Sequence, residues 1–347
     1  MSRGQTPGHG LLDRLAQGPV ICAEGYVFEL ERRGYLQAGA FVPEAVLEHP
    51  EVVRQLHRDL VHAGSDVVEA LTYYAHREKL RIVDREAELE RLNREALRIA
   101  KEVAAESGAL LAGDVSNTNV FLDGDAGSAK AVRAMFEEQV GWAADAGVDY
   151  VVAETFSFAK EALIALDVIK QAGLPAVVTL DAPREPLTYE GWTPAEACRR
   201  LEAAGADVVG LNCGRGPRTM MPLLREIRRA VGCHVAALPV PYRTTEAEPT
   251  FFSLTDPDGG GRPFPTALDP FLCTRYEIAE FGREALELGV RYLGVCCGAG
   301  PHHVRSLAEA LGRTPPASRY SPDMSKHAFL GTDRRVRQEY RDYGQRI

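Results

Sequence analysis

The sequence predicts an α/β fold, a (β/α)8 TIM barrel with a short C-terminal extension. Three observations predict it: a repeated phrase occurs four times, amphipathic stretches precede its copies, and further short apolar runs fall between them. A chain in which helical and strand patterns alternate is expected to form parallel strands joined by helices. The eight strands counted in this way favour a closed barrel over an open sheet.

The repeated phrase joins a glycine to a short apolar strand. Glycine commonly ends a helix, and a β-branched run that is apolar throughout is typical of a parallel strand buried on both faces. The four copies begin at Ala63, Ala146, Ala204 and Leu288, and the helices before them are expected at residues 51–62, 131–145, 194–203 and 276–287. The other four strands are expected at residues 19–22, 109–114, 176–180 and 234–240.

The chain is predicted to have three regions. Residues 1–10 are short, polar and glycine-rich and are expected to be flexible, and residues 11–313 hold the barrel. Residues 314–347 form the extension, either a solvated tail or an arm that contacts another subunit, with a short helix expected in 333–344. The longest irregular stretch is 243–270, and a loop of that length in a compact domain is usually functional or mobile.

Composition excludes several classes of protein. The 347 residues are 45% hydrophobic and 26% charged, as in an ordinary globular chain and unlike a disordered or fibrous one. A net charge of −9 with no basic stripe argues against a nucleic-acid partner. No apolar run approaches the roughly 18 residues of a membrane helix. We therefore expect a cytoplasmic protein with no membrane anchor.

Three of the seven cysteines follow predicted strands. Cys213 ends the sixth strand, and the adjacent Cys296 and Cys297 end the eighth, so the three thiols should converge where the strands of a barrel open onto one face. Three thiolates leave one position of a zinc ion for a substrate, and zinc would keep a thiol substrate deprotonated. The adjacent pair could instead pack in the core or form a vicinal disulfide.

Aromatic residues gather after the first and second predicted strands. They are Tyr26, Phe41, Tyr73 and Tyr74. Aromatic faces attract cations that cannot donate a hydrogen bond, such as quaternary ammonium and sulfonium groups. These rings therefore predict a site for an onium compound, although Tyr73 and Phe41 could equally pack the mouth of the barrel.

Several stretches together resemble the homocysteine S-methyltransferase family, and within it the betaine-homocysteine S-methyltransferases. They are Phe28-Glu-Leu-Glu-Arg-Arg-Gly-Tyr-Leu, Tyr74-Ala-His-Arg-Glu-Lys-Leu, Gly210-Leu-Asn-Cys and Gly294-Val-Cys-Cys-Gly, within a match from about residue 10 to residue 313. The resemblance implies a barrel that binds Zn²⁺ through Cys213, Cys296 and Cys297. It also implies transfer of a methyl group from a small onium donor, such as glycine betaine, to the thiol of homocysteine, which gives methionine.

The resemblance also assigns residues to the two substrates. Glu154 matches the glutamate that holds the homocysteine amino group, and Tyr74 matches the tyrosine beside betaine. Phe41 stands where the family has a tryptophan and Thr155 where it has a tyrosine, which implies a reshaped donor pocket that Tyr26 and Tyr73 would complete.

The chain departs from the family pattern after its first strand. The family reads Asp-Gly-Gly there, whereas this chain has Ala23-Glu24-Gly25. Glu24, beside Gly25, is expected to replace the lost carboxylate in binding homocysteine. Otherwise the acceptor is held differently or is another thiol.

Other functions remain open from the sequence. The donor could be a sulfonium, such as S-methylmethionine or dimethylsulfoniopropionate, or a methylated corrinoid protein, since the chain has no cobalamin module of its own. Because of the change at Ala23-Glu24, the barrel could also bind zinc or a thiol without transferring a methyl group. We expect a homo-oligomer.

Overall fold

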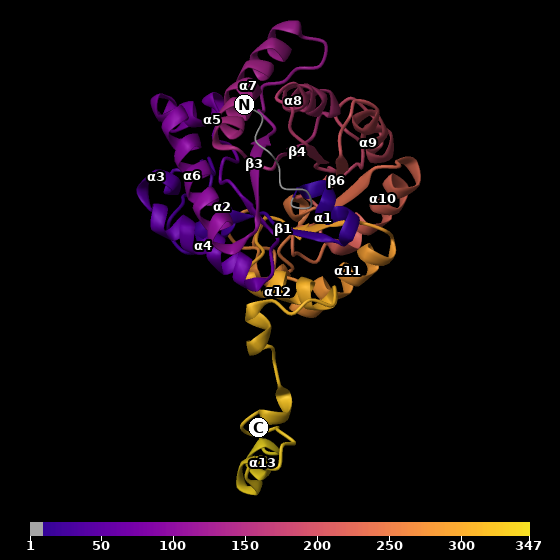
Figure 1. The fold of residues 1–347 in the computed structure, drawn as a ribbon. Helices are drawn as coiled ribbons and strands as arrows, with labels where there is room; N and C mark the ends of the chain where they lie inside the picture. The colour runs from indigo at the N-terminus through magenta and orange to yellow at the C-terminus, as the bar shows by residue number, and fades with distance from the viewer. Residues whose placement is uncertain (1–9) are drawn as a thin grey trace.

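Eight parallel strands line the centre of the protein in the computed structural model, which describes residues 10–347 (Figure 1). All eight predicted strands are present, so the expected (β/α)8 barrel is confirmed. The flexible segment expected at residues 1–10 lies, up to residue 9, outside the described residues. The strands are β1 (Val20–Ala23), β2 (Val67–Glu69), β3 (Leu110–Ser116), β4 (Tyr150–Phe156), β5 (Ala176–Leu180), β6 (Val208–Asn212), β7 (His234–Leu238) and β8 (Tyr292–Val295).

The barrel closes between β1 and β2 through a side chain as well as the backbone. Neighbouring strands pair in the order β1-β8-β7-β6-β5-β4-β3-β2, which leaves β1 and β2 at the two ends of the ladder. There the Asp66 amide donates to the Ile21 carbonyl at 2.8 Å, and the Ile21 amide donates to the Asp66 carboxylate at 2.7 Å. Arg313, just beyond the last barrel helix, pairs with Asp66 and donates to the Pro19 carbonyl.

The helices form a ring around the strands (Figure 1). The four helices expected before the repeated phrase are present, and three of them begin within one residue of the expected position, whereas α7 begins five residues earlier. It begins at Ala126 because the Asp125 carboxylate accepts hydrogen bonds from the amides of Gly127 and Ser128. The helices of the ring are α2 (Tyr26–Arg32), α3 (Ala45–Glu48), α4 (Pro50–Ala63), α5 (Arg77–Ile82), α6 (Leu89–Ser107), α7 (Ala126–Ala146), α8 (Ala159–Gln171), α9 (Pro194–Ala203), α10 (Pro217–Ala230), α11 (Arg275–Glu287) and α12 (Pro301–Ala310).

A separate helix, α1 (Leu11–Gln17), covers the N-terminal end of the barrel (Figure 1). Its Leu11 and Leu15 are buried against the side chains that fill the barrel interior. In that interior the hydroxyls of Tyr150 and Tyr292 lie 2.9 Å apart. The N-terminal end is therefore sealed, and only the C-terminal end is open to substrates.

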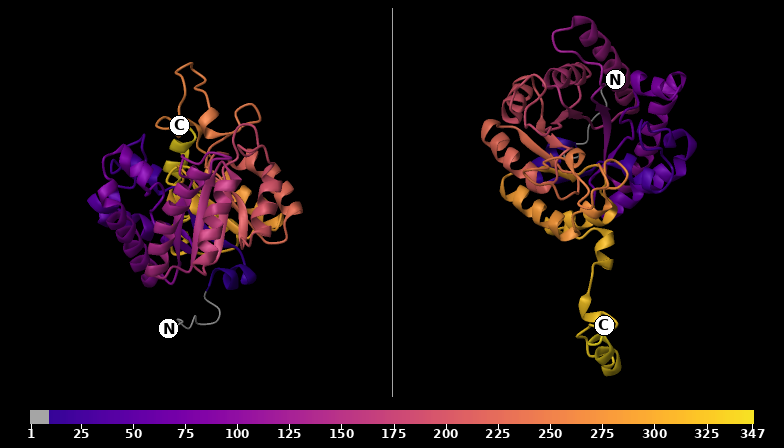
Figure 2. Two further views of the ribbon diagram at one scale, coloured as in Figure 1. Left: turned by 90° about the horizontal axis from the view of Figure 1, so that it is seen from above. Right: turned by 180° about the vertical axis from the view of Figure 1, so that it is seen from behind.

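The long loop between β7 and α11 stands over this open end, on the side opposite α1 (Figure 2). It contains two short 3-10 turns, η2 (Phe251–Ser253) and η3 (Asp269–Phe271). The irregular stretch expected at 243–270 thus lies where the strand ends carry the polar and thiol side chains.

The C-terminal extension projects away from the barrel (Figure 1). It comprises η4 (Pro316–Tyr320), η5 (Met324–Lys326) and α13 (Gln338–Gly344). The helix expected in 333–344 is shorter than predicted, because the Asp333 carboxylate accepts the Arg335 amide and forms a local turn. No helix of residues 10–347 is long and apolar enough to cross a membrane.

Candidate active site

Three thiols meet at the C-terminal end of the barrel. Cys213 follows β6 directly, and Cys296 and Cys297 follow β8. The Cys297 sulfur lies 3.8 Å from that of Cys213 and 3.9 Å from that of Cys296, and all three cysteines are free. The predicted convergence of these thiols is confirmed, whereas the expected alternative of a vicinal disulfide is not observed.

The spacing of the three sulfurs fits a tetrahedral metal ion. Zinc binds thiolates at about 2.3 Å, which places two sulfurs of one tetrahedral site about 3.8 Å apart. The three sulfurs lie within 4.8 Å of one another and are the softest donor set of the described residues. Cys213, Cys296 and Cys297 could therefore hold a zinc ion with one position left for another ligand.

The pKa values of the three thiols are shifted in different directions. Hydrogen bonds with Cys296 and Cys297 lower the pKa of Cys213 well below its ordinary value. Burial raises the pKa of Cys296, and the hydrogen bond to Cys213 raises that of Cys297. Without a cation, the site therefore favours one thiolate, at Cys213.

The backbone beside the thiols has little spare room. Gly25, between β1 and α2, has a φ of +93°, and a Cβ placed on it would lie 2.7 Å from the carbonyl oxygen of Cys296. Only glycine combines this conformation with so close an approach. The predicted site residue Gly25 thus lies against the Cys296-Cys297 peptide.

Two buried glutamates lie below the thiols, linked by an asparagine. The Asn212 side chain donates to Glu24 at 3.2 Å and also to Glu154, and the Thr155 hydroxyl donates to Glu154 at 2.8 Å. The second oxygen of the Glu24 carboxylate is buried without a partner. Burial raises the pKa of Glu154 to about 8 and raises that of Glu24, so a bound cation would favour the charged form of both.

A small inner pocket lies between Glu154 and the thiols of Cys296 and Cys297. It has a volume of about 20 Å³. The Tyr26 ring lines it and not the larger cavity outside, and of the other three predicted donor rings only Tyr73 also lines the inner pocket. The wall also contains Gly25, Glu69, Asp114, Glu154, Cys296 and Cys297.

A larger outer cavity of about 510 Å³ opens above Cys213 and Cys297. Phe41, Tyr73, Tyr74 and Thr155 all line it, as the sequence predicted for a donor pocket. The Tyr73 and Tyr74 rings lie 4.2 Å apart, and the Lys79 ammonium lies 4.0 Å from the centre of the Tyr74 ring.

Strained backbone gathers around this outer cavity. Six non-glycine residues between 10 and 347 have a positive φ, and five of the six line the cavity. Such conformations are costly and are retained mainly at functional sites. The five are Phe41, Tyr74, Asn119, Thr155 and Cys213.

The long β7–α11 loop supplies more rings to the outer cavity. Phe251, Phe252 and Phe264 pack on one another, with Phe264 centred 4.6 Å from Phe252. Phe28 stacks on Phe41 at 5.2 Å and also contacts Phe251. Aromatic side chains from the segment after β1 and from the β7–α11 loop therefore form part of the cavity wall.

Charged side chains complete the outer cavity. Arg184 and Arg262 line it, and so does Asp181, which follows β5. Burial raises the pKa of Asp181 to about 8, and one oxygen of its carboxylate is buried without a partner. The cavity thus combines apolar rings with groups that can pair with either end of a zwitterion.

Comparison with known proteins identifies the family of this site. The family model described as "Homocysteine S-methyltransferase" matches residues 21–311. The chain belongs to the homocysteine S-methyltransferase family. Betaine–homocysteine S-methyltransferase 1 of Xenopus tropicalis is 38% identical over 335 residues, which cover 93% of this chain and 80% of the relative. The expected thiol S-methyltransferase is thereby confirmed at the level of the family.

A second relative and a solved structure of other homocysteine methyltransferases are also similar to this chain. S-methylmethionine–homocysteine S-methyltransferase BHMT2 of Rattus norvegicus is 35% identical, with 93% of this chain and 86% of the relative covered. The metallated form of the Escherichia coli homocysteine methyltransferase MmuM shares the fold. Its TM-score is 0.66 at 20% identity, and the match covers 86% of this chain and 97% of MmuM.

In this homocysteine S-methyltransferase, several residues that line the two pockets were not predicted from the sequence. Asp114 and Glu69 interrupt apolar strands, which was a usable signal, because a charged residue within a buried strand needs a reason. Asp181 follows a predicted strand in the same way as the thiols do. The phenylalanines of the 243–270 loop gave no such signal, since nothing local fixes which way a loop side chain points.

Proposed function

We propose that this protein transfers a methyl group from a small onium donor, of the glycine betaine type, to the thiol of homocysteine and so forms methionine. The observation that carries the proposal is the spacing of Cys213, Cys296 and Cys297 between an acidic inner pocket and an aromatic outer cavity. Zinc is the ion that three thiolates at this spacing suit best. A cytoplasmic location, where thiols stay reduced, agrees with this chemistry.

The acceptor is proposed to lie between the thiols and the acids. Its sulfur would take the fourth position of the metal, and its ammonium group would pair with Glu154 and Glu24. One oxygen each of Glu24 and Glu154 and the Cys296 sulfur lie within 4.8 Å of one another, which suits a ligand whose sulfur and nitrogen are a few bonds apart. Glu24 would thus supply the carboxylate that Ala23 lacks, and Gly25 would give the ligand room.

The donor is proposed to occupy the outer cavity. Phe41, Tyr73 and Tyr74 would surround its cationic group, and the small Thr155 would leave space beside them. Tyr26 lines the inner pocket, so it would contact the acceptor close to the transferred methyl group rather than the donor. Asp181, Arg184 and Arg262 would pair with the remaining charges of a zwitterionic donor.

The transfer is proposed to be a direct, in-line displacement. Zinc, when bound, would keep the acceptor sulfur as a nucleophilic thiolate near neutral pH. A sulfur–carbon bond forms while the bond from the methyl carbon to the donor nitrogen or sulfur breaks, and that nitrogen or sulfur keeps the electron pair and becomes neutral. Because charge is cancelled in this step, the aromatic walls of the outer cavity favour it by keeping water away and by aligning the donor.

Replacement of each thiol tests the metal site. Cys213→Ala, Cys296→Ala and Cys297→Ala are each expected to lose bound zinc and methyl transfer together, measured by metal analysis and by methionine formation. Cys233→Ala, a half-buried thiol outside the site, is the matched control and is expected to keep both. Full activity of a zinc-free protein would contradict the proposal.

Replacement of Glu24, the glutamate that departs from the family pattern, tests the proposed acceptor site. Glu24→Gln removes the charge and keeps the shape, and we expect the KM for homocysteine to rise at least tenfold while the KM for the donor stays within twofold. Equal changes in both values would show that Glu24 supports the fold rather than the acceptor.

The same assay separates the remaining candidates. Glycine betaine, S-methylmethionine, dimethylsulfoniopropionate and a methylated corrinoid protein are each supplied with homocysteine, and the donor that yields methionine is identified directly. Stabilisation of the protein by these ligands without any product would favour a barrel that binds zinc and thiols but does not catalyse transfer.

A further inference from the structure

The three thiols are held by backbone of two kinds. The amides of Cys213 and Cys296 donate to carbonyls at or just after the end of β7, at 3.0 and 2.9 Å. Cys297 lies one residue further along, in a turn that closes where the Ala299 amide donates to the Cys296 carbonyl at 3.1 Å. We call residues 296–299 the Cys297 turn. Cys297 is only half-buried, whereas the other two thiols are buried, so the position of its sulfur depends mainly on what holds this turn.

Gly298 seats the Cys297 turn against a tyrosine of the β7–α11 loop. Its φ of +90° is the conformation that a type II turn requires at its third residue. A Cβ placed on Gly298 would lie 2.0 Å from the hydroxyl oxygen of Tyr242, which is fully buried. The turn and the Tyr242 side chain are therefore in direct contact, and only glycine permits this contact.

Arg32, the last residue of α2, binds both partners of this contact. One terminal nitrogen of its guanidinium donates to the Gly298 carbonyl at 2.8 Å, and the other donates to the Tyr242 hydroxyl oxygen at 3.1 Å. Hydrogen bonds from a charged guanidinium are roughly twice as strong as those between neutral groups, and its planar fork fixes both acceptors in one geometry. The Arg32 side chain is 26% exposed, so water screens these bonds only in part.

The same side chain also contacts the loop that walls the outer cavity. Arg32 pairs with Asp269 of η3 at 3.5 Å, an ion pair to an exposed carboxylate that contributes little by itself. The Tyr242 ring stacks on Phe251 with 5.8 Å between the ring centres, and Phe251 lines the outer cavity. Arg32 lines neither pocket, so it can affect the site only through these neighbours.

The adjacent arginine has partners of a different kind. The Arg33 side chain is 30% exposed, donates to Glu29 at 2.7 Å and pairs with Asp59 at 3.7 Å. The two acceptors of Arg32, by contrast, lie 266 and 210 residues away along the sequence. Arg32 therefore joins α2, the β7–α11 loop and the Cys297 turn, whereas Arg33 pairs with two carboxylates of α2 and α4.

We infer that Arg32 is a positioning residue of the thiol site. It holds the Cys297 turn against Tyr242, so that the Cys297 sulfur stays at the spacing from the other two thiols that a shared ion requires. Through Tyr242 and Phe251 it also fixes this turn relative to the aromatic wall of the outer cavity. The inference rests on the proposed function only in that the three thiols bind a metal ion, and it needs no substrate.

Release of the metal tests this role on the full chain without substrates. The zinc-loaded protein is mixed with an excess of a chelator, and the rate of zinc transfer is measured. Arg32→Met removes both hydrogen bonds and keeps most of the side-chain length, and we expect zinc release to be at least tenfold faster. Tyr242→Phe removes a single hydroxyl and should speed release at least threefold, which keeps the inference testable if Arg32→Met does not fold.

A cobalt spectrum separates positioning from general stability. Co²⁺ takes the place of zinc, and its thiolate charge-transfer absorption reports how many sulfurs are bound. We expect Arg32→Met to lose about one third of this absorption, because one of the three thiolates is no longer held. Arg33→Met is the matched control and should keep both the release rate and the spectrum. Denaturant unfolding verifies that each variant is folded.

Three results would overturn the inference. The first is a zinc release rate that is unchanged in Arg32→Met, or in Tyr242→Phe if only that variant folds. The second is faster release with an unchanged cobalt spectrum, which would show that Arg32 supports the fold and not the place of the Cys297 sulfur. The third is an equal change in Arg33→Met. A full chain that binds neither ion would overturn the proposed metal site as well, so the two failures are distinct.

Discussion

Single residues at the site are constrained by the backbone around them, and Gly25 is the clearest case. A Cβ at this position would lie 2.7 Å from the Cys296 carbonyl oxygen, and an alanine there would have to adopt a left-handed backbone conformation. We expect Gly25→Ala to lower both zinc content and methyl transfer at least tenfold, because it displaces the Cys296-Cys297 peptide.

The control for this prediction is Gly34→Ala. Gly34 has a similarly positive φ of +78°, but nothing lies within 4 Å of its Cβ position. The Gly34→Ala substitution should therefore cost only the conformational strain, about 1 to 2 kcal/mol of unfolding free energy, and the variant should retain activity. Equal losses in the two variants would contradict a role for close approach at Gly25.

A buried histidine makes stability depend on pH. His57 on α4 is 1% exposed, neither ring nitrogen has a partner, and burial lowers its pKa to about 3. The unfolded chain therefore takes up a proton near pH 6.5 that the folded protein excludes, so stability is lost as the pH falls below 6.5. One such group contributes a loss of about 1.4 kcal/mol at pH 5.5.

His57→Leu is expected to remove that part of the pH dependence. The measurement is the free energy of unfolding in denaturant at pH 7.5 and at pH 5.5, with replacement of the exposed His62 on the same helix as the control. An unchanged difference between the two pH values would contradict the assignment.

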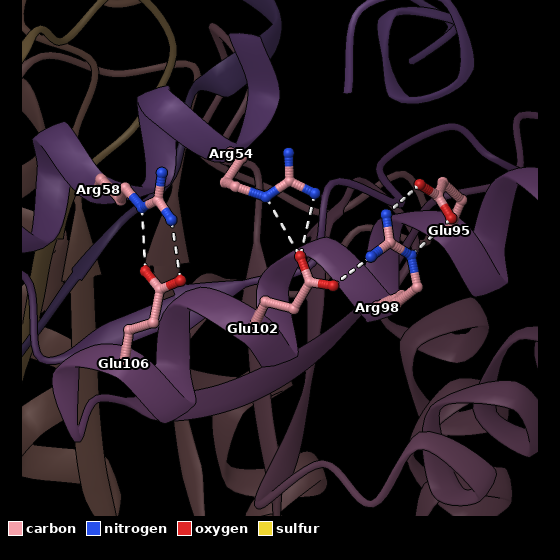
Figure 3. A network of polar contacts seen from close by, with 6 residues as sticks. All are labelled: Arg54, Arg58, Glu95, Arg98, Glu102 and Glu106. Carbon is pink, nitrogen blue, oxygen red and sulfur yellow. Dashed lines mark hydrogen bonds and ion pairs between the residues drawn. The ribbon is translucent and has the colours of Figure 1, made fainter. Parts of the chain in front are cut away.

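At the scale of elements, we predict that apolar packing between α4 and α6 stabilises the fold more than the ion pairs that join the two helices. Figure 3 shows Arg54 and Arg58 of α4 facing Glu102 and Glu106 of α6, at 3.0 and 2.8 Å. These side chains are partly exposed, and exposed ion pairs contribute at most about 1 kcal/mol each. Leu56 on α4, by contrast, is fully buried.

Two substitutions test this ranking. Leu56→Ala is expected to lower the free energy of unfolding by about 2 to 5 kcal/mol, since it removes buried methyl groups and leaves a cavity. Glu102→Gln should cost less than about 1 kcal/mol, and less still in high salt. A larger effect for Glu102→Gln than for Leu56→Ala in denaturant unfolding would contradict it.

For the whole molecule, the extension is predicted to serve assembly rather than barrel stability. Its start is tied to the barrel, because the Arg305 side chain donates to the Tyr320 carbonyl and the Ser321 hydroxyl donates to Glu309. Beyond Ser321 its rings pack mainly on each other, as Phe329 does on Tyr343 at 5.3 Å.

A chain that ends at Ser321 tests this role. We expect it to keep the unfolding midpoint of the barrel, within about 2 °C, and to sediment as a monomer, whereas the full chain sediments as a homo-oligomer. A full chain that sediments as a monomer would contradict the predicted oligomer, and a shortened chain that unfolds earlier would show that the extension supports the barrel.

The barrel itself could be predicted from the sequence because its signals are local. Neighbouring residues determine that a helix ends at a glycine and that an apolar strand follows it. The repetition of this pattern indicated where strands lie along the chain. The same register placed Cys213, Cys296 and Cys297 together, since parallel strands of one barrel end at one face.

The walls of the two pockets depended on contacts between distant residues. Phe251 and Phe264 reach the outer cavity from a loop of irregular backbone, and Tyr26 turns into the inner pocket although it follows the same strand as Glu24. The sequence alone determined the eight-stranded barrel, the thiol trio and the family of the protein. Only the tertiary structure decided which carboxylates stand unpaired beneath the thiols, because that depends on which side chains from separate strands share one small volume.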